Sequence, residues 1–156
     1  MAVKANHDIS SGLDTAFINS AINSNLAYRP EFVSNDYTQG KKVSVAIERE
    51  LRHCDAFYIS VAFITEGGLA PLKQVLAELR DKGIPGKILT TSYLTFTEPK
   101  ALKTLADLSN VEVRVYDSTD EGASGFHTKG YIFKEEEIYR FIVGSSNMTC
   151  LLYTSD

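Results

Sequence analysis

The sequence has no tryptophan, four prolines and only two cysteines among its 156 residues. Cys54 and Cys150 lie far apart, which gives neither a disulfide framework nor the paired spacing of a zinc site, and we expect Cys54 to be an ordinary buried thiol. No apolar run approaches the roughly 18 residues that a membrane-spanning helix needs, and nothing resembles a signal peptide. These absences predict a cytoplasmic protein with no membrane partner.

An excess of positive charge is also missing. The chain has 16 Lys and Arg residues against 20 Asp and Glu residues, a net charge of −4. A protein that holds nucleic acid with its whole surface is basic, so any anion-binding site here has to be local. The hydrophobic content of 44% and the charged content of 23% predict one globular domain.

The start of the chain differs in pattern from the rest. Residues 1–27 read as a polar lead-in, which contains His7 without an evident role, followed by a helix over 13–26. Residues 28–40 are punctuated like a loop, and we expect the domain proper to span residues 28–149.

Helical and strand-like segments then alternate. Helices are predicted over 41–54, 69–83 and 98–110, and buried strands over 56–65, 86–92 and 111–117. His53 lies at the end of the first of these helices, where a histidine interacts favourably with the helix dipole. The β-α-β-α-β order predicts an α/β fold with right-handed crossovers and a mainly parallel sheet flanked by helices.

A β-hairpin is predicted at the C-terminal end of this domain. Its strands are the runs "HTKGYIFK" and "IYRFIVGSS", joined by an acidic turn at residues 135–137. Side chains alternate between the two faces of a strand, so His127, Lys129 and Tyr131 should share one face, and the His127 and Lys129 side chains can converge on one ligand.

The second strand of the hairpin ends in Gly144-Ser145-Ser146-Asn147, and antiparallel pairing should return this end to the neighbourhood of His127 and Lys129. An imidazole that attacks phosphorus or moves a proton, a fixed cation and neutral donors from Ser and Asn together suit a phosphodiester. Taken singly, each of these residues reads as an ordinary exposed histidine, solvated lysine or Gly-Ser turn. The combination favours a phosphate site.

His127-Thr128-Lys129 followed by Gly144-Ser145-Ser146-Asn147 resembles the signature half-site of the phospholipase D superfamily, which is H-x-K-x4-D followed by G-S-x-N. The wider chain, from about Tyr28 to Thr149, is similar to the phospholipase D-like nuclease domain at the N-terminus of bacterial DEAD/DEAH-type helicase proteins. It is also similar to certain metal-independent restriction endonucleases.

The resemblance implies a metal-independent phosphodiesterase acting on DNA, with no cofactor. His127 would attack phosphorus or protonate the leaving oxygen through a phosphohistidine intermediate, while Lys129, Ser145 and Asn147 would bind the phosphate oxygens. Such a mechanism needs two histidines, and neither His7 nor His53 has the companion lysine. The resemblance therefore implies a homodimer that completes the site.

The chain departs from the superfamily pattern in two places. Lys134 stands where the full motif has Asp, as in restriction-type members that also lack it, and Glu135, Glu136 and Glu137 read more simply as a solvated turn than as the supporting carboxylate. Residues 150–156 resemble the translation of a sequencing adapter, so we expect an artefactual tail on a domain that is incomplete at its C-terminus, and a fused helicase domain beyond it.

Other functions stay open at this point. A non-catalytic module that binds DNA phosphate or dimerises would use the same residues. A phospholipid hydrolase is less favoured, because no membrane-facing helix is evident, and a nucleotide-binding protein is disfavoured by the lack of a glycine-rich phosphate loop. Ser60, Thr65, Gly67 and Gly68 follow a buried strand where α/β sheets bind ligands, but loop punctuation explains them equally well.

Overall fold

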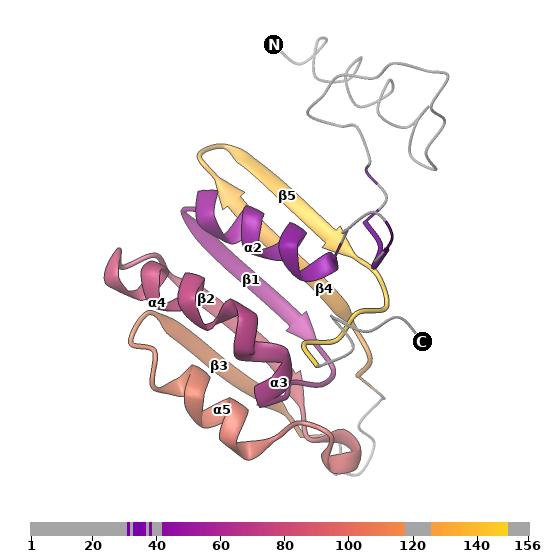
Figure 1. The fold of residues 1–156 in the computed structure, drawn as a ribbon. Coiled ribbons are helices and arrows are strands. Elements are labelled where there is room, and N and C mark those ends of the chain that lie inside the picture. Colours follow the sequence, from indigo (N-terminus) through magenta and orange to yellow (C-terminus); the bar gives the residue numbers. More distant parts are fainter. Residues whose placement is uncertain (1–30, 32, 37, 39–41, 118–125, 150–156) are drawn as a thin grey trace, which may run out of the picture. The chain divides into compact units, whose positions relative to one another are not determined.

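The computed structural model describes residues 31, 33–36, 38, 42–117 and 126–149 (Figure 1). The chain divides into two units, Met1–Ser34 and Asn35–Asp156, and every helix and strand below belongs to the second. His7, the helix predicted over 13–26 and the tail over 150–156 lie outside the described residues.

A five-stranded sheet forms the centre of the second unit, with the strand order β3-β2-β1-β4-β5. Its strands are β1 (Ala56–Val61), β2 (Gly86–Thr91), β3 (Val111–Tyr116), β4 (Lys129–Glu135) and β5 (Ile138–Val143). β2 pairs in parallel with both β1 and β3, whereas β4 pairs antiparallel with both β1 and β5. The α/β class and the C-terminal hairpin are therefore confirmed.

The prediction of a mainly parallel sheet was wrong, because the sheet is mixed. The hairpin extends the three parallel strands from their edge at β1, with β4 antiparallel to β1, so that β1 lies at the centre of the sheet between β2 and β4. Alternation of side chains identifies a strand, but it carries no information about which strand becomes its neighbour. Local pattern could therefore predict the hairpin and not its antiparallel attachment to β1.

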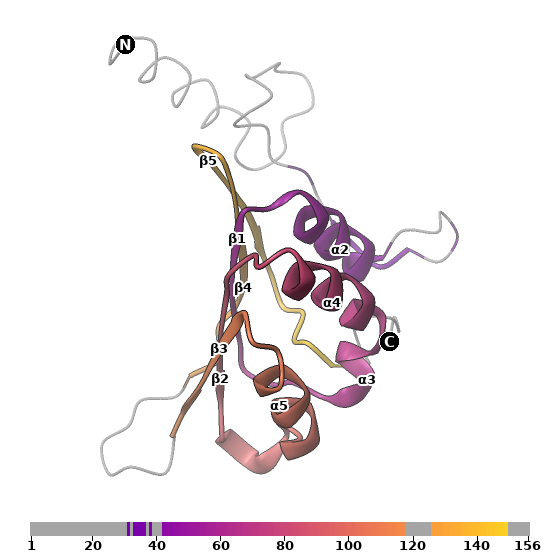
Figure 2. The ribbon, with the colours of Figure 1, turned by 90° about the vertical axis from the view of Figure 1, so that its left-hand side faces the viewer.

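The helices of the described part all lie on one face of the sheet, as Figure 2 shows from the side. They are α2 (Val43–His53), α3 (Glu66–Leu69), α4 (Lys73–Asp81) and α5 (Pro99–Ala106), with short 3-10 turns η2 (Ala70–Leu72) and η3 (Tyr93–Thr95). The single helix expected over 69–83 is thus three consecutive pieces. Pro71 lies at the start of η2, where its missing N–H is tolerated, and Gly83 follows α4 with a φ of 70°.

The core lies between this helical layer and the sheet. The predicted stripe of α2, Val43, Ile47 and Leu51, is buried, as are Phe57 and Ile59 of β1. β1 was expected to be buried on both faces, and this is wrong for its outward side. Tyr58 is exposed, because the described helices cover only the other face.

Within the described residues, no helix combines the length and the apolar character needed to cross a bilayer.

Candidate functional site

His127 and Lys129 meet at the start of β4. Lys129 pairs with Val61 at the end of β1, and its side chain is buried on the face that carries the helices. Its ammonium lies 2.6 Å from Nδ1 and 3.0 Å from Nε2 of His127, and 3.0 Å from the backbone oxygen of the same residue. The structure thus brings together the two side chains whose convergence the alternation predicted.

Lys129 and His127 differ in exposure. Burial lowers the pKa of the Lys129 ammonium below its ordinary value of 10.5. A protonated lysine can only donate hydrogen bonds, so it can act on the ring or on an anion only as a donor. The His127 side chain is exposed to solvent.

The Gly144–Asn147 segment returns to the same place, as the antiparallel pairing predicted. Gly144 donates its backbone N–H to the carbonyl oxygen of Lys129 over 3.3 Å. The hydroxyl of Tyr131, on the buried face of β4, donates to the carbonyl oxygen of Ser146 over 2.9 Å. These two bonds hold the segment at the start of β4, with Ser145 exposed at its surface.

Asn147 is attached to the residues that follow β1. Its Oδ1 accepts a hydrogen bond from the backbone N–H of Phe63 over 3.2 Å. The next residue, Met148, donates to the Phe63 carbonyl over 3.1 Å and accepts from the Thr65 N–H over 3.0 Å. Because Oδ1 is engaged, the side-chain NH₂ is the group of Asn147 that can donate to a phosphate oxygen.

Two residues that follow β1 support this attachment instead of facing a ligand. The Thr65 hydroxyl accepts a hydrogen bond from the Gly68 N–H and so caps α3. A Cβ on Gly68 would lie only 2.1 Å from the carbonyl oxygen of Met148. Gly68 is therefore required for the close approach between α3 and the Asn147–Met148 segment.

Ser60, near the end of β1, lies on the uncovered face of the sheet. Its hydroxyl is hydrogen-bonded to the Thr128 hydroxyl over 2.6 Å.

Phe63 is the site residue that the sequence analysis missed. Its ring lies edge-on to the His127 ring, with centroids 5.9 Å apart and planes at 70°, while its backbone holds Asn147. Phe63 was counted as an ordinary member of an apolar strand. Its position directly beyond the carboxyl end of β1 was a usable signal, because ligands of α/β sheets bind at that edge.

The acidic turn lies at the wrong end of β4 to support His127. Glu135 pairs with Ile138 at the tip of the hairpin, and the Glu136 N–H donates to the Asp55 carboxylate before the start of β1. A seven-residue strand is roughly 20 Å long, which separates these carboxylates from Lys129. No described carboxylate is hydrogen-bonded to His127 or Lys129, so the supporting carboxylate is still unassigned.

The other histidine of the described part has a local role. His53 ends α2, is exposed, and has its Nδ1 2.7 Å from the carbonyl oxygen of Arg49 one turn earlier. This is the helix-end position that the sequence predicted. In the described ranges, no three His, Cys, Asp or Glu side chains gather in a way that could hold a metal ion.

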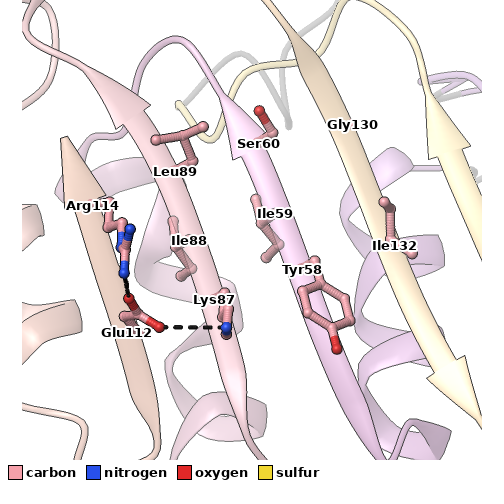
Figure 3. Close-up of a pocket in the computed structure, with 10 residues that line it drawn as sticks. All are labelled: Tyr58, Ile59, Ser60, Lys87, Ile88, Leu89, Glu112, Arg114, Gly130 and Ile132. Atoms are coloured by element: carbon pink, nitrogen blue, oxygen red, sulfur yellow. Dashed lines mark hydrogen bonds and ion pairs between the residues drawn. The ribbon is translucent and has the colours of Figure 1, made fainter. Parts of the chain in front are cut away.

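A hollow lies elsewhere, on the uncovered face of the sheet (Figure 3). It measures about 400 Å³ and is lined by side chains from β1, β2, β3 and β4. Lys87 and Arg114 share a single carboxylate there, because both pair with Glu112, at 3.6 Å and 2.6 Å. Its lining contains no histidine or cysteine, whereas His127 and Lys129 meet at the start of β4.

The chain matches no protein-family model, and no curated protein matches it. The resemblance to the phospholipase D superfamily therefore rests on the sequence alone, on the two motifs and on the likeness of the wider chain.

Proposed function

We propose that this chain is a phosphodiesterase domain of the phospholipase D type, which cleaves DNA through a phosphohistidine formed on His127. The observation that carries the proposal is the contact between the Lys129 ammonium and the His127 imidazole, 2.6 Å apart at Nδ1. A solvated lysine would have no reason to hold its ammonium beside the ring. Here the lysine is buried and its ammonium is directed at the ring.

The contact also provides a way to activate the imidazole. An anionic phosphate oxygen competes with the ring for the Lys129 ammonium, because a charge-assisted hydrogen bond to an anion is stronger than one to a neutral nitrogen. When the ammonium moves to the phosphate, the lone pair of His127 becomes free to attack phosphorus. Lys129 would then stabilise the charge on the equatorial oxygens, together with Ser145 and the NH₂ of Asn147.

The reaction has two balanced steps. The His127 lone pair forms an N–P bond while the bond from phosphorus to the leaving oxygen breaks, and a second imidazolium gives that oxygen its proton. A water molecule then attacks phosphorus, gives a proton to the second imidazole, and the N–P bond breaks to release the phosphomonoester and free His127.

The second imidazole would come from another copy of the chain. His53 is the only other described histidine, and it is fixed at the far end of α2. We propose a two-fold homodimer in which the exposed His127 rings of both copies face one phosphate. The resemblance favours DNA as the substrate and a fused helicase as the setting.

A non-catalytic module is the second candidate, because one chain supplies only one histidine-lysine pair. In that case the buried Lys129 and Asn147 would hold a backbone phosphate without cleaving it. The two candidates differ in one observable, the covalent bond to His127.

The test is cleavage of end-labelled DNA by the purified chain in a chelating buffer, followed by an alkaline quench that preserves phosphohistidine. We expect cleavage and a labelled protein that survives alkali and is lost in acid. His127→Ala should abolish both signals, and Lys129→Met should slow cleavage on the order of 10²-fold to 10³-fold. His53→Ala is the matched control and should be as active as the wild type.

DNA binding that depends on Lys129, without cleavage or label, would favour the non-catalytic module and refute the enzyme. Hydrolysis of phosphatidylcholine in place of DNA would refute the proposed substrate.

A further inference from the structure

Large apolar side chains are exposed on the turn that follows β2, next to the proposed phosphate site. Tyr93, Leu94 and Phe96 are 43%, 58% and 57% exposed. This turn includes η3 and leaves the sheet at the carboxyl end of β2, beside the end of β1 from which Phe63 emerges. Exposed apolar groups gathered at such an edge mark a binding surface more often than a defect.

The turn is built to hold these side chains outward. Leu94 and Thr95 have φ angles of 53° and 55°, a left-handed conformation that non-glycine residues adopt only when their surroundings enforce it. The base of the turn is clamped by buried threonines, since the Thr97 hydroxyl lies 3.0 Å from the Thr91 carbonyl oxygen. The Thr91 hydroxyl in turn accepts the Tyr93 N–H over 3.1 Å.

An aromatic row connects the turn to the catalytic histidine. The Phe96 ring lies edge-on to Phe63, with centroids 5.1 Å apart, and Phe63 lies edge-on to His127 at 5.9 Å. The exposed ring of Phe96 is thus separated from His127 by a single side chain. A ligand whose phosphate contacts His127 can extend along this row.

We propose that Phe96 and its neighbours stack against an unpaired nucleobase of the bound strand, so that the substrate is single-stranded nucleic acid. This inference rests on the proposed phosphate site. Exposed aromatic rings beside a backbone-binding site stack on any base, because every base has a π-face, whereas the bases of a duplex are already stacked and enclosed. The alternating contacts with phosphate and base fit a single strand.

A membrane surface would be the other occupant of an apolar turn. Surface-binding segments are usually amphipathic helices with lysine and arginine along the polar side. Here the exposed apolar side chains lie on the three-residue turn η3 and on Phe96 directly after it, and no lysine or arginine lies among them. The lack of such a helix and the aromatic row that leads to His127 favour the nucleobase.

The test measures binding and not cleavage, in chelator and on ice, with two fluorescent probes of equal length and charge. One is oligothymidylate and the other is the same backbone with abasic sites. We expect the wild type to bind oligothymidylate more tightly, and Phe96→Ala to weaken only that probe, by about 10-fold. Phe96→Trp should retain the preference. Phe141→Ala is the matched control, because Phe141 is an equally exposed phenylalanine on β5.

The variants and probes distinguish a failure of base stacking from a failure of the phosphate site. Lys129→Met should weaken both probes equally, and no effect on either would refute the phosphate site. Equal binding of the two probes by the wild type, or equal weakening of both by Phe96→Ala, would refute base stacking while leaving the phosphate site intact. If the wild type bound phosphatidylcholine vesicles more tightly than oligothymidylate, and Phe96→Ala abolished the binding to vesicles, the turn would be a membrane-binding element. That result would overturn the inference.

Discussion

Lys129 reaches His127 from the buried face of the sheet, with its ammonium 2.6 Å from Nδ1 and 3.0 Å from the backbone oxygen of the same residue. A lysine is rarely buried without a carboxylate, because removal of its charge from water is costly. Here the atoms nearest the ammonium are the ring nitrogens and the backbone oxygen of His127, and no carboxylate is among them. The arrangement leaves an incompletely compensated cation beside an exposed imidazole, which is the condition that an incoming phosphate would satisfy.

The first prediction concerns the pH dependence of stability. Burial lowers the pKa of Lys129 in the folded chain below its ordinary value of 10.5, so the unfolded chain binds this proton more tightly. The buried ammonium therefore destabilises the folded chain at low pH. This destabilisation is lost as the pH rises towards 10.5 and the lysine loses its proton in the folded chain. The free energy of unfolding of the wild type should therefore rise relative to that of Lys129→Met over this range. Urea unfolding at a series of pH values measures it.

Lys82→Met, which removes an exposed lysine just after α4, is the control for that series. Parallel curves for the wild type and Lys129→Met would contradict the assignment of a desolvated ammonium.

The second prediction concerns the close approach at Gly68. Gly68→Ala would place a Cβ 2.1 Å from the Met148 carbonyl oxygen and 2.5 Å from the Thr149 nitrogen, both in the backbone. We expect a loss of about 1 to 3 kcal/mol in the free energy of unfolding, as for other overpacked sites. The segment that contains Asn147 should also detach from the residues that follow β1. Hydrogen exchange at the backbone amides of Thr65 and Met148 should then be faster than in the wild type.

Gly130→Ala is the matched control, because a Cβ on Gly130 meets nothing within 4 Å. If Gly68→Ala and Gly130→Ala had the same amide exchange rates and the same free energy of unfolding, the position of the Asn147 segment would not depend on the contact at Gly68.

The third prediction concerns Cys54, which is buried and free. Burial raises the pKa of its thiol from 9.0 to about 11. At pH 8 this lowers the thiolate population about 100-fold, and only the thiolate reacts with disulfide reagents. In a Cys150→Ser background, the native chain should react with Ellman's reagent at least that much more slowly than the chain in urea. Equal rates would place Cys54 at an accessible surface.

The fourth prediction concerns the shared site. If each dimer needs both His127 rings, inactive His127→Asn chains should exchange into wild-type dimers and disable them. With a ninefold excess of His127→Asn, only about one tenth of the wild-type subunits would keep a wild-type partner, and activity per wild-type subunit should fall to that level. Titration of a fixed wild-type concentration measures this. Unchanged activity would show that one chain is sufficient.

Several features could be read from the sequence because they depend on neighbouring residues. The stripe Val43, Ile47 and Leu51 predicted α2, and Pro99 and Gly83 marked helix ends that the structure places within a residue or two. The alternation of His127, Lys129 and Tyr131 placed them on one face, and the hairpin returned Gly144 to Lys129. A helix or strand period is a local property, so one sequence is enough to detect it.

Only the tertiary structure decided which segments became neighbours. It placed β4 beside β1, carried Asn147 to the backbone of Phe63 and pressed Gly68 against Met148. Each of these contacts joins residues far apart in the chain. Their choice depends on how whole faces pack, and no local period encodes that.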